Sequence, residues 1–524
     1  MGDTPRLDIP WGSLGHLLED AAARHGDRTQ FIFEGASRTF AETNRQVNRL
    51  ANALRGLGIA KGDRVSVMLP NGFDFPTAWL ALAKLGAVMV PTNTAYVERD
   101  LQFVLSDSGA KAILLDEEYL PRLEAVRASL PALEHVLAVG TPGLNTLIES
   151  ASESFTIDGV GQDDLLNIQY TSGTTGFPKG CMLTHRYWLL MGQLTYEYLR
   201  IMPDDVDLTA QPFYYMDPQW NTSACMIAGV PLVIMPRFSV SRFWPTVHEH
   251  GVTFFYVLGT MPFFLMKRES DELERSHRLR IVACSGIAPD FHAEFERRFN
   301  VPWREAFGMT ETGVDLLVPL DDAASVGSGA MGAPVRTKRA RVIDAEGSDL
   351  PDGEIGQLIV SGEPMMLGYW NLPDKTAETI RDGWLHTGDL VYRDARGYFH
   401  WVGRLKDMVR RGGENISASE VESVIMEHER IRAAAVVPVP DPLRGEEVKV
   451  YVVLKDGETP ETLPPVAIVE FAARKLARFK LPRYVEYVDR FPLTPSERVA
   501  KHELIKGRAD LRANSYDMVD AVWR

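Results

Sequence analysis

Cysteine is scarce in this sequence, with only Cys181, Cys225 and Cys284 in a chain of 524 residues. Their wide separation fits no metal-binding motif, and an odd number cannot pair completely within one chain. We therefore expect free, mostly buried thiols in a reducing cytoplasm, where disulfides rarely persist. Nothing in the sequence supports a catalytic cysteine.

Long apolar runs and an excess of basic residues are also missing. No segment approaches the roughly 18–20 apolar residues of a membrane-spanning helix, and residues 1–6 do not resemble the start of a signal peptide. The formal net charge of −15 argues against a general nucleic-acid binder, because duplex binding needs a basic surface. We expect no membrane span and no nucleic-acid partner, while a local basic patch for an anionic cofactor stays open.

The chain is long enough for more than one domain. Its 524 residues are 45% hydrophobic and 24% charged, which is typical of a globular protein with two or more domains. Helices and strands alternate in the first part, which implies a parallel sheet with helices on its faces. The expected helices span residues 13–22, 39–57, 74–85 and 98–108, and the expected strands span residues 64–69, 87–91 and 112–115.

Past residue 404 the pattern changes to consecutive strands flanked by helices. We expect helices at residues 419–429 and 466–478 and strands at residues 433–438 and 449–454. This shift supports a domain boundary near Arg404, which divides the chain into residues 1–404 and 405–524. The predicted fold class is α/β, with a large N-terminal domain of layered sheets and flanking helices and a small C-terminal α+β domain.

A loop rich in glycine and hydroxyl groups lies between two strand-like runs. It reads Tyr170-Thr171-Ser172-Gly173-Thr174-Thr175-Gly176-Phe177-Pro178-Lys179-Gly180. Glycine lets backbone N–H groups approach an anion closely, and successive N–H groups form a concavity that holds phosphate oxygens. The hydroxyl groups add further donors, and the lysine adds a mobile point charge. This composition predicts a loop that binds polyphosphate.

The loop has two other possible interpretations, a flexible linker and a Walker loop. A flexible surface linker is the commoner fate of such a composition, but the ordered runs on both sides favour a built loop. A Walker loop needs lysine directly after its second glycine and then serine or threonine. Here Lys179 lies three residues past Gly176 and is followed by Gly180, so the Walker motif is excluded.

The loop closely resembles the phosphate loop of the adenylate-forming enzymes. This superfamily includes acyl-CoA synthetases, the adenylation domains of peptide synthetases, and luciferases. Further matches recur at ordered intervals across nearly the whole chain. The resemblance implies ATP, Mg²⁺ and, for the acyl-CoA synthetases, coenzyme A as the molecules bound. It also implies that Thr171 and the residues up to Gly176 hold phosphate, with Lys179 as a catalytic cation.

Two segments resemble the adenine and metal-binding parts of the family. Gly286-Ile287-Ala288 follows a strand-like run and resembles the adenine loop. The run Phe307-Gly308-Met309-Thr310-Glu311 is close to the family signature Tyr-Gly-Met-Thr-Glu, with phenylalanine in place of tyrosine. The implied roles are stacking of Phe307 on adenine and a hydrogen bond from Thr310 to the α-phosphate. Glu311, together with Thr175, is the implied ligand of Mg²⁺, a hard cation that prefers oxygen.

Two later segments match family signatures for the ribose and the hinge. Asp389 ends the run of residues 383–389 and would accept hydrogen bonds from ribose hydroxyls. By the same resemblance, Arg404 contacts ribose and Lys406 is the hinge about which a small mobile domain turns. The Gly412-Gly413 loop resembles the part of that domain that faces the thiol channel of CoA ligases.

An aromatic segment supplies candidates for one wall of an acid pocket. These are Tyr214, Tyr215, Asp217 and Trp220. The alternative is a core loop with buried aromatic side chains, and the two interpretations are evenly balanced without the family context. If Asp217 faces the pocket, an ammonium group or another donor on the substrate is its natural partner. The pattern aromatic–Met–Asp–x–Gln resembles carnitine/crotonobetaine-type CoA ligases, and the wall favours a medium-chain or aromatic acid over acetate.

The sequence departs from the family pattern near its end. Relatives carry glycine and then a lysine that binds carboxylate and α-phosphate during adenylation, whereas this chain has Glu497 and Arg498. Lys501 falls on a later basic position. Arginine keeps the charge but not the geometry of lysine. Either Arg498 or Lys501 serves the first step, or that step depends less on this residue here.

The resemblance therefore implies a cytoplasmic, ATP-dependent ligase acting on a small carboxylic acid. It would form acyl-AMP and pyrophosphate and then transfer the acyl group to coenzyme A. One alternative keeps adenylation but uses an amine acceptor or an unusual or inorganic acid, as in an amide synthetase or a diazotase-like enzyme. A second alternative is a nucleotide-binding regulator without catalysis. The sequence does not determine the acid, and a homodimer is compatible with it.

Overall fold

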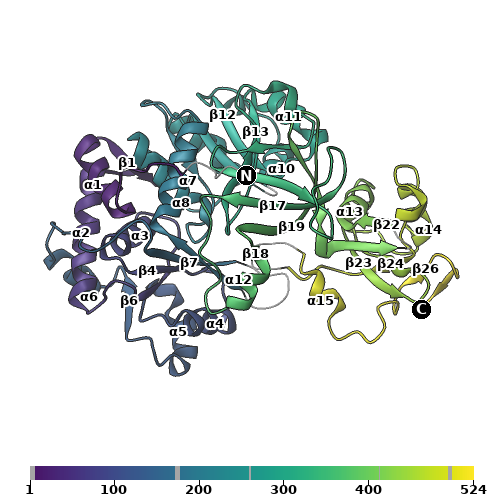
Figure 1. Ribbon diagram of the computed structural model, residues 1–524, viewed down its shortest axis with the longest axis horizontal. Coiled ribbons are helices and arrows are strands. Elements are labelled where there is room, and N and C mark those ends of the chain that lie inside the picture. Colours follow the sequence, from purple (N-terminus) through teal and green to yellow (C-terminus); the bar gives the residue numbers. More distant parts are fainter. Residues whose placement is uncertain (1–5, 172–177, 259–260, 412–413, 494–498) are drawn as a thin grey trace.

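The computed structural model describes residues 6–171, 178–258, 261–411, 414–493 and 499–524. Figure 1 shows the C-terminal elements gathered at one end of the long axis and the N-terminal helices at the opposite end. This is the expected α/β fold with a larger N-terminal part and a smaller C-terminal part. Within these ranges, no helix combines the length and the apolar character that crossing a membrane requires.

The first sheet carries the predicted phosphate loop at its end. Its strands lie in the order β6-β5-β3-β4-β7-β8, and the pairs are parallel except for β7 with β8. The strands alternate with helices, as the sequence predicts, because each helix buries an apolar face on the sheet. The bounds are β3 Arg64–Met68, β4 Val88–Pro91, β5 Ala112–Asp116, β6 His135–Val139, β7 Leu165–Thr171 and β8 Lys179–Thr184.

The surrounding helices begin at residues that satisfy free backbone donors. Thr39 accepts a hydrogen bond from the Glu42 N–H, and the Glu42 carboxylate accepts one from the Thr39 N–H, which closes a capping box. Thr184 caps α7 by accepting from the Tyr187 N–H, as the sequence predicts. The bounds are α1 Leu14–His25, α2 Phe40–Gly56, α3 Asp74–Leu85, α4 Glu98–Ser108, α5 Leu120–Val126, α6 Pro142–Ser150 and α7 His185–Tyr198.

The second and larger sheet has a parallel half and an antiparallel half. Its order is β16-β17-β19-β20-β15-β14-β13-β12-β11-β9-β10-β1-β2, with β18 paired to β19. The run from β13 to β1 is parallel, and the other pairs are antiparallel. The bounds are β1 Thr29–Phe33, β2 Ala36–Thr39, β9 Asp207–Thr209, β10 Leu232–Ile234, β11 Phe254–Leu258, β12 Ile281–Ser285, β13 Trp303–Met309, β14 Gly313–Leu317, β15 Ala330–Pro334, β16 Lys338–Ile343, β17 Gly356–Gly362, β18 Ile380–Arg381, β19 Trp384–Arg393 and β20 Phe399–Arg404.

Three of the helices that accompany the larger sheet, α9, α10 and α11, pack against a second apolar core in which the rings of Phe243, Trp244, Phe299 and Trp303 meet. Such aromatic clusters contribute strongly to burial. Helix α8 packs beside α7 in the main core, and α12 lies next to β18 and β19 in the antiparallel half. The bounds are α8 Met216–Ala228, α9 Val240–Glu249, α10 Met261–Lys267, α11 Pro289–Phe299 and α12 Pro373–Thr379.

The C-terminal part has its own sheet and its own core. The strand order is β22-β21-β24-β25-β26-β27, with β23 paired to β24. Valine and isoleucine side chains from these strands and from α13 and α14 form a separate cluster of buried residues. The bounds are β21 Met408–Arg411, β22 Glu414–Ser417, α13 Ala418–Met426, β23 Ile431–Asp441, β24 Gly445–Leu454, α14 Pro465–Ala472, β25 Tyr484–Tyr487, α15 Lys501–Ile505, β26 Tyr516–Asp517 and β27 Val522–Trp523.

The chain passes from the larger sheet to the C-terminal sheet within a few residues. Strand β20 of the larger sheet ends at Arg404, a single turn covers Leu405–Asp407, and β21 of the C-terminal sheet begins at Met408. The hydroxyls of Ser417 and Ser419 donate to the Val402 carbonyl oxygen at 2.8 and 3.2 Å, so the two parts touch beside this turn. The domain boundary at residue 404 and the hinge at Lys406 remain predictions. Both fall at this connection between the two sheets.

Two segments differ from the sequence-based expectations. The turn-rich aromatic stretch of residues 211–221 becomes helix α8 from Met216 onward. Pro218 is tolerated there because the first turn of a helix has no acceptors for its backbone N–H groups. The helix expected to reach residue 478 ends at Ala472, and short turns replace its last part.

Candidate active site

The ends of the predicted phosphate loop are held together by strand pairing. Thr171 on β7 lies opposite Lys179 on β8. Gly180 has no room for a side chain, because a Cβ there would come within 2.5 Å of the Ile168 Cγ2 atom. The predicted ligands inside the loop lie outside the described residues, and these are Ser172, Gly173, Thr174, Thr175 and Gly176.

Lys179 and Glu311 contact the same side chain, that of Tyr369. The Lys179 ammonium lies 4.2 Å from the centroid of the Tyr369 ring. The Tyr369 hydroxyl donates a 2.7 Å hydrogen bond to Glu311 Oε1. Tyr369 is 4% exposed and Glu311 is 7% exposed, so both contacts are largely shielded from water. The predicted phosphate lysine and the predicted metal carboxylate thus meet at one buried ring.

Thr310 and Glu311 occupy the turn between β13 and β14. The hydroxyl of Tyr187 on α7 donates to the Thr310 carbonyl oxygen at 3.0 Å, which ties the turn to the helix after the phosphate loop. Gly313 closes the turn with a φ of 71°. A Cβ on Gly313 would lie 2.5 Å from the Met191 Sδ atom, so only glycine fits this conformation and this space.

A buried ion pair between Asp315 and Lys338 lies next to the same turn and is bonded to it through Thr312. Thr312 donates to Asp315 Oδ2 at 2.5 Å, and Lys338 Nζ lies 3.2 Å from Asp315 Oδ1. The side chains of Asp315 and Lys338 are fully buried. Burial raises the pKa of Asp315 and lowers the pKa of Lys338, and each partner opposes the shift of the other. The backbone of Glu311 is fixed further by a 2.7 Å hydrogen bond from the Met366 N–H to its carbonyl oxygen.

Gly286 and Ile287, at the start of the predicted adenine loop, are bound by a half-buried acid. Glu305 on β13 accepts hydrogen bonds from both backbone N–H groups. Cys284 Sγ lies 3.5 Å from Glu305 Oε2. Burial raises the pKa of Glu305 to about 7, while the backbone donors oppose the rise. Ala288, the third loop residue, is the N-cap of α11.

Phe307, Gly308 and Met309 form the end of β13. Phe307 and Met309 are half-buried and pack against the main core. A Cβ on Gly308 would lie 2.0 Å from the Gly313 carbonyl oxygen, so the close approach of the two strands requires glycine. The half-buried Phe307 ring keeps part of its surface accessible, as stacking on a base requires.

Asp389 and Arg404 form an ion pair across β19 and β20. They lie opposite each other in the strand register, with Arg404 Nε 2.7 Å from Asp389 Oδ1. Trp401 Nε1 donates to the same oxygen at 3.2 Å. Asp389 is fully buried, whereas 42% of the Arg404 side chain is exposed. The two predicted ribose ligands are thus in direct contact, in the sheet that also contains β13.

Tyr214 and Tyr215 lie in a turn whose carbonyl oxygens accept hydrogen bonds from the amide side chains of two glutamines. Gln169 on β7 donates to the Tyr214 carbonyl oxygen at 2.6 Å, and Gln219 on α8 donates to the Tyr215 carbonyl oxygen at 2.9 Å. The two tyrosine rings are 4.8 Å apart. The turn is therefore connected to the strand that leads into the phosphate loop.

Asp217 and Trp220 follow in the first turns of α8. Trp220 is 9% exposed, and its ring lies edge-on to Tyr256 with 5.4 Å between the centroids. Burial raises the pKa of Asp217 to about 6, and a hydrogen bond with Trp220 opposes the rise. The Asp217 charge also raises the pKa of Tyr256, after burial, so the two side chains are close. The Tyr256 hydroxyl donates to Ser285 on β12 at 2.9 Å, which links this wall to the adenine side.

Of the candidates in the C-terminal part, the structure describes Lys406 and Lys501. Lys406 falls in the turn Leu405–Asp407, while Gly412, Gly413 and Arg498 lie outside the described residues. Lys501 forms an ion pair with Glu422 on α13 at 2.7 Å and lies 3.8 Å from Asp407. In this conformation the structure therefore shows Lys501 engaged within the C-terminal part.

The described residues suit a magnesium ion that is shared with a nucleotide. Among them, no group of three or more His, Cys, Asp or Glu side chains could hold a metal by itself. Glu311 is a single buried carboxylate, and no described residue donates a hydrogen bond to its Oε2 atom. Mg²⁺ is commonly bound by one or two carboxylates together with substrate phosphates. The donor set therefore fits a cation that arrives with ATP.

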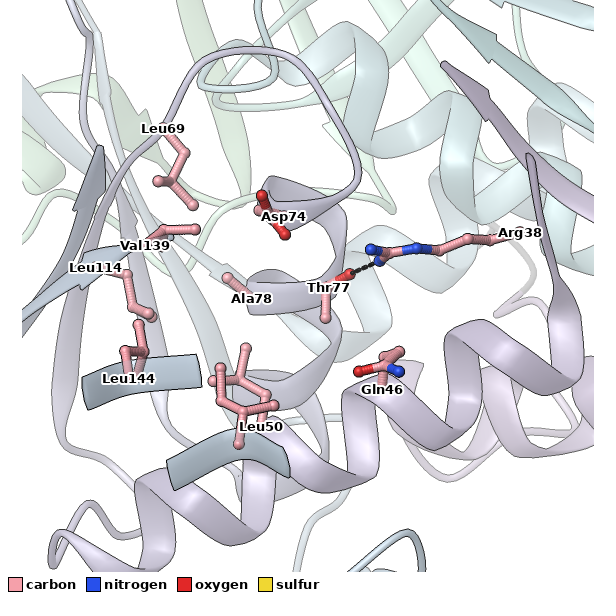
Figure 2. A pocket seen from close by; sticks show the side chains of 11 residues that line it. Arg38, Gln46, Leu50, Leu69, Asp74, Thr77, Ala78, Leu114, Val139 and Leu144 are labelled. Atoms are coloured by element: carbon pink, nitrogen blue, oxygen red, sulfur yellow. Dashed lines mark hydrogen bonds between the residues drawn. The ribbon is translucent and has the colours of Figure 1, made fainter. Parts of the chain in front are cut away.

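A cavity of about 70 Å³ lies in another part of the large domain, among α2, α3, β5, β6 and α6. Figure 2 shows its leucine lining and the Arg38 side chain reaching Thr77, with a hydrogen bond of 3.4 Å. Such a volume admits a few water molecules and is too small for a nucleotide. None of the predicted site residues lines it.

The sequence analysis missed several residues that the structure joins to the site. Tyr369 and Tyr187 contact the Thr310–Glu311 turn, Glu305 binds the adenine loop, and Tyr256 joins the acid wall. Each lies far along the chain from its partner. Of the four, only Glu305 stood next to a recognised motif, and nothing marked its side chain as an acceptor for the loop at residue 286.

Two family models match the chain. The model described as AMP-binding enzyme matches residues 18–370, and the model described as AMP-binding enzyme C-terminal domain matches residues 420–498. The chain belongs to the AMP-binding enzyme family. The resemblance inferred from the phosphate loop and the later motifs is therefore confirmed.

This AMP-binding enzyme is similar over nearly its whole length to a relative named as a CoA ligase and to an ATP-bound structure. It is 32% identical over 515 residues to crotonobetaine/carnitine–CoA ligase of Proteus mirabilis (strain HI4320), which covers 94% of this chain and 98% of that protein. ATP-bound MatB from Rhodopseudomonas palustris is 30% identical, with a TM-score of 0.85 and coverage of 94% and 98%.

A structure with a reaction intermediate is also similar. o-Succinylbenzoate CoA synthetase (MenE) from Bacillus subtilis, in complex with the acyl-adenylate OSB-AMP, is 26% identical, with a TM-score of 0.84 and coverage of 94% and 98%. The comparisons confirm the adenylate-forming fold and support the acid–CoA ligase interpretation over a different acceptor.

Proposed function

We propose that this AMP-binding enzyme activates a carboxylic acid that carries a cationic group and transfers the acyl group to coenzyme A. The observation that supports the cationic part is Asp217, a half-buried carboxylate beside the rings of Trp220 and Tyr256. A cytoplasmic location belongs to the proposal and is supported by three buried cysteines, all of them free. A homodimer stays a prediction.

The first half-reaction is an attack of the substrate carboxylate on the α-phosphorus of ATP, with pyrophosphate as the leaving group. Lys179 neutralises phosphate charge, Thr310 donates to the α-phosphate, and Glu311 offers Oε2 to the metal of Mg·ATP. The magnesium ion, when bound, further neutralises the triphosphate. Catalysis of this kind depends mainly on positioning and on compensation of charge. A basic residue of the C-terminal part, Arg498 or Lys501, completes the set.

Asp389, Arg404 and the adenine loop hold the rest of the nucleotide. Asp389 is already oriented by Arg404 and Trp401, so its carboxylate is prepared to accept hydrogen bonds from ribose hydroxyls. Phe307 stacks on the adenine. The loop of Gly286, Ile287 and Ala288 presents small residues to the flat base, with its backbone held by Glu305.

In the second half-reaction the CoA thiol displaces AMP from the acyl-adenylate. We infer that the C-terminal domain turns about Lys406 between the two steps and brings the Gly412-Gly413 loop to the thiol channel. A turn about one short segment is a common way to switch between two arrangements of rigid domains. The two domains have separate cores, and the described residues join them by hydrogen bonds of Ser417 and Ser419 to the Val402 carbonyl oxygen, next to this segment, which supports such a motion.

The chemistry of the acid wall favours a cation on the substrate. A carboxylate near aromatic rings is poorly solvated, which is why the pKa of Asp217 rises to about 6. A cation beside it compensates the charge, and aromatic rings attract a quaternary ammonium through their faces. The relatives named as crotonobetaine/carnitine–CoA ligases act on acids of this kind, as their name states.

The test compares acids that differ only in charge. Pyrophosphate release is measured with ATP, Mg²⁺ and CoA for a trimethylammonium butyrate and for its neutral tert-butyl isostere. We expect kcat/KM to be higher by about tenfold or more for the cationic acid, a preference that one charged contact can supply. AMP release should require CoA, and release supported by an amine instead would favour the alternative acceptor.

Asp217→Asn isolates the contribution of the carboxylate. The variant should remove most of the preference for the cationic acid and should change kcat/KM for the neutral acid by less than about threefold, because only the charge is lost. Asp456→Asn is the matched control, since Asp456 is 99% exposed in the C-terminal part. Equal losses for both acids, or a wild-type preference for the neutral acid, would contradict the proposed substrate.

A further inference from the structure

Tyr369 is fixed by its backbone between the phosphate loop and the Thr310–Glu311 turn. The Met182 N–H donates to the Gly368 carbonyl oxygen, the Leu367 N–H to Met182, and the Trp370 N–H to Gly180, at 2.9, 2.9 and 2.8 Å. This segment therefore runs beside β8, the strand that begins with Lys179. On its other side, the Met366 N–H binds the Glu311 carbonyl oxygen.

The remaining polar groups near Tyr369 leave its orientation little freedom. The Tyr369 N–H donates to Thr376 Oγ1 at 2.9 Å. Gly368 has a φ of 144°, and a Cβ there would come within 2.6 Å of the Thr376 Cγ2 atom. A side chain at position 368 is excluded by both conformation and space. The ring of Tyr369 is thus directed by a backbone that is bonded on two sides.

The two ends of the Tyr369 side chain make different contacts. Its ring face lies 4.2 Å from the Lys179 ammonium, which is a cation–π contact. Its hydroxyl donates to Glu311 Oε1 at 2.7 Å, which is a charge-assisted hydrogen bond. Burial, together with the Glu311 charge, raises the pKa of Tyr369, so the hydroxyl keeps its proton and acts as the donor.

These contacts assign complementary tasks to the two neighbours. Glu311 Oε1 is occupied by the Tyr369 hydroxyl, while no described residue donates to Oε2. Lys179 has a long, flexible side chain whose ammonium loses mobility when it rests on a ring. Both side chains are then already ordered before the nucleotide binds, so less conformational entropy is lost on binding and the affinity for the nucleotide is higher.

We propose that Tyr369 is a positioning residue of the adenylation site, holding the Lys179 ammonium with its ring and the Glu311 carboxylate with its hydroxyl. The inference rests on the proposed function, in which Lys179 and Glu311 serve the triphosphate and its magnesium ion. Tyr369 itself contacts neither substrate nor metal in this assignment. Its hydroxyl, through Glu311, affects how much Mg²⁺ strengthens the binding of ATP. Its ring, through Lys179, affects the affinity for ATP without the metal.

Two substitutions separate the ring from the hydroxyl. Tyr369→Phe keeps the ring and removes the donor, and Tyr369→Leu removes both. Tyr487→Phe is the control, because the Tyr487 hydroxyl donates to the Leu463 carbonyl oxygen within the C-terminal part at 2.5 Å. Calorimetry measures the Kd of ATP in EDTA and the Kd of Mg·ATP for each full-length protein, without any acid substrate.

In the wild type, Mg²⁺ should strengthen the binding of ATP. We expect Tyr369→Phe to reduce this strengthening by about tenfold and to leave the Kd of ATP in EDTA within about twofold, because only the bond to Glu311 is lost. Tyr369→Leu should show the same reduction and should also weaken ATP in EDTA by about fivefold, because Lys179 loses the ring. Tyr487→Phe should change neither value.

The inference is overturned if Tyr369→Phe leaves the effect of Mg²⁺ unchanged, or if it weakens ATP with and without Mg²⁺ by the same factor. The second result would indicate a general structural defect, and the melting temperature of the conservative Phe variant would show it independently. Failure of the proposed function would appear in a different measurement, the release of pyrophosphate. In that case the wild type would release no pyrophosphate with any acid, while the binding data on Tyr369 would still decide its role.

Discussion

Glu305 illustrates how one half-buried carboxyl group can organise a binding loop. It accepts hydrogen bonds from the backbone N–H groups of Gly286 and Ile287, so its carboxyl oxygens hold the first residues of the adenine loop. Burial raises its pKa from the ordinary value of 4.5 to about 7. The folded protein therefore binds this proton more tightly than the unfolded chain does.

The raised pKa of Glu305 predicts a pH dependence of stability. Stability from the protonated acid is fully present below about pH 4.5 and is lost as the pH rises through about 7. Relative to Glu305→Gln, the wild-type free energy of unfolding should fall over this window by up to about 1.4 kcal/mol per pH unit and then level off. Urea denaturation at several pH values measures it.

The control for this series is Glu429→Gln, since 86% of the Glu429 side chain is exposed. Its pH dependence should follow that of the wild type. If Glu305→Gln also follows the wild type between about pH 5 and 7, the side chain does not titrate as its burial requires.

Asp389 is the residue on which the ribose contact should depend most. It is fully buried, and Arg404 and Trp401 both contact its Oδ1 atom. Asp389→Asn should weaken AMP binding by about tenfold to a hundredfold, since hydrogen bonds to a charged group contribute about 1.5–3 kcal/mol. Calorimetry with AMP measures the loss, and no acid substrate is needed.

A nearby aspartate provides the comparison for Asp389→Asn. Asp394 directly follows β19, the strand that carries Asp389, and accepts a hydrogen bond from His400 at 2.9 Å instead of pairing with Arg404. Asp394→Asn should leave AMP affinity within about threefold, because its charge makes no ribose contact in the proposed site. Equal weakening by both variants would mean that Asp389 acts only through the fold.

At the scale of elements, the turn between β13 and β14 rests on a buried pair. Asp315 on β14 and Lys338 on β16 have fully buried side chains, 3.2 Å apart, and Thr312 bonds to the same aspartate. Lys338 also donates to the Gly362 and Pro364 carbonyl oxygens. The turn that carries Thr310 and Glu311 is thus anchored to two neighbouring strands.

Removing one partner of this pair should be costly. Lys338→Met leaves the Asp315 charge buried without its partner, and such losses amount to about 3–5 kcal/mol of unfolding free energy. The double variant Lys338→Met/Asp315→Leu should recover a large share, because no buried charge is left alone. Urea denaturation of the two variants measures the difference, and a double variant no better than the single one would contradict this explanation.

At the scale of the whole molecule, the position of Lys501 bears on the domain motion. Its ion pair with Glu422 lies within the C-terminal part, where Lys501 is 22% and Glu422 14% exposed. A rigid rotation of that part about Lys406 leaves the pair intact. Only the longer contact of 3.8 Å to Asp407, in the turn beside the hinge, would change.

We therefore expect Lys501 to stabilise the C-terminal domain and Arg498 to serve adenylation. Lys501→Met should lower the free energy of unfolding by about 1–3 kcal/mol, because it leaves the partly buried Glu422 without its cationic partner, with only the Val436 N–H still donating to the carboxylate. Arg498→Ala should slow pyrophosphate release far more than Lys501→Met does. Stopped reactions without CoA, combined with urea denaturation, measure both effects, and the reverse order of the two rates would assign the first step to Lys501.

The sequence by itself determined the features that are local in the chain. The prediction of a phosphate loop, the capped helix after it and the α/β pattern follow from short-range rules on glycine, hydroxyl groups and apolar periodicity. The Thr310–Glu311 segment was recognised by its resemblance to a family signature. These expectations led to the family, and the family models confirm it. The start of α8 was missed because Pro218 suggests a turn, although the first turn of a helix accepts it.

Only the tertiary structure decided which distant side chains meet. Tyr369 joins Lys179 to Glu311, and Glu305 binds the loop at Gly286, through contacts that no local pattern encodes. The engagement of Lys501 with Glu422 is of the same kind. The reason is physical: a buried hydrogen bond or cation–π contact depends on the packing of several strands at once, and the spacing of residues along one strand does not contain that information.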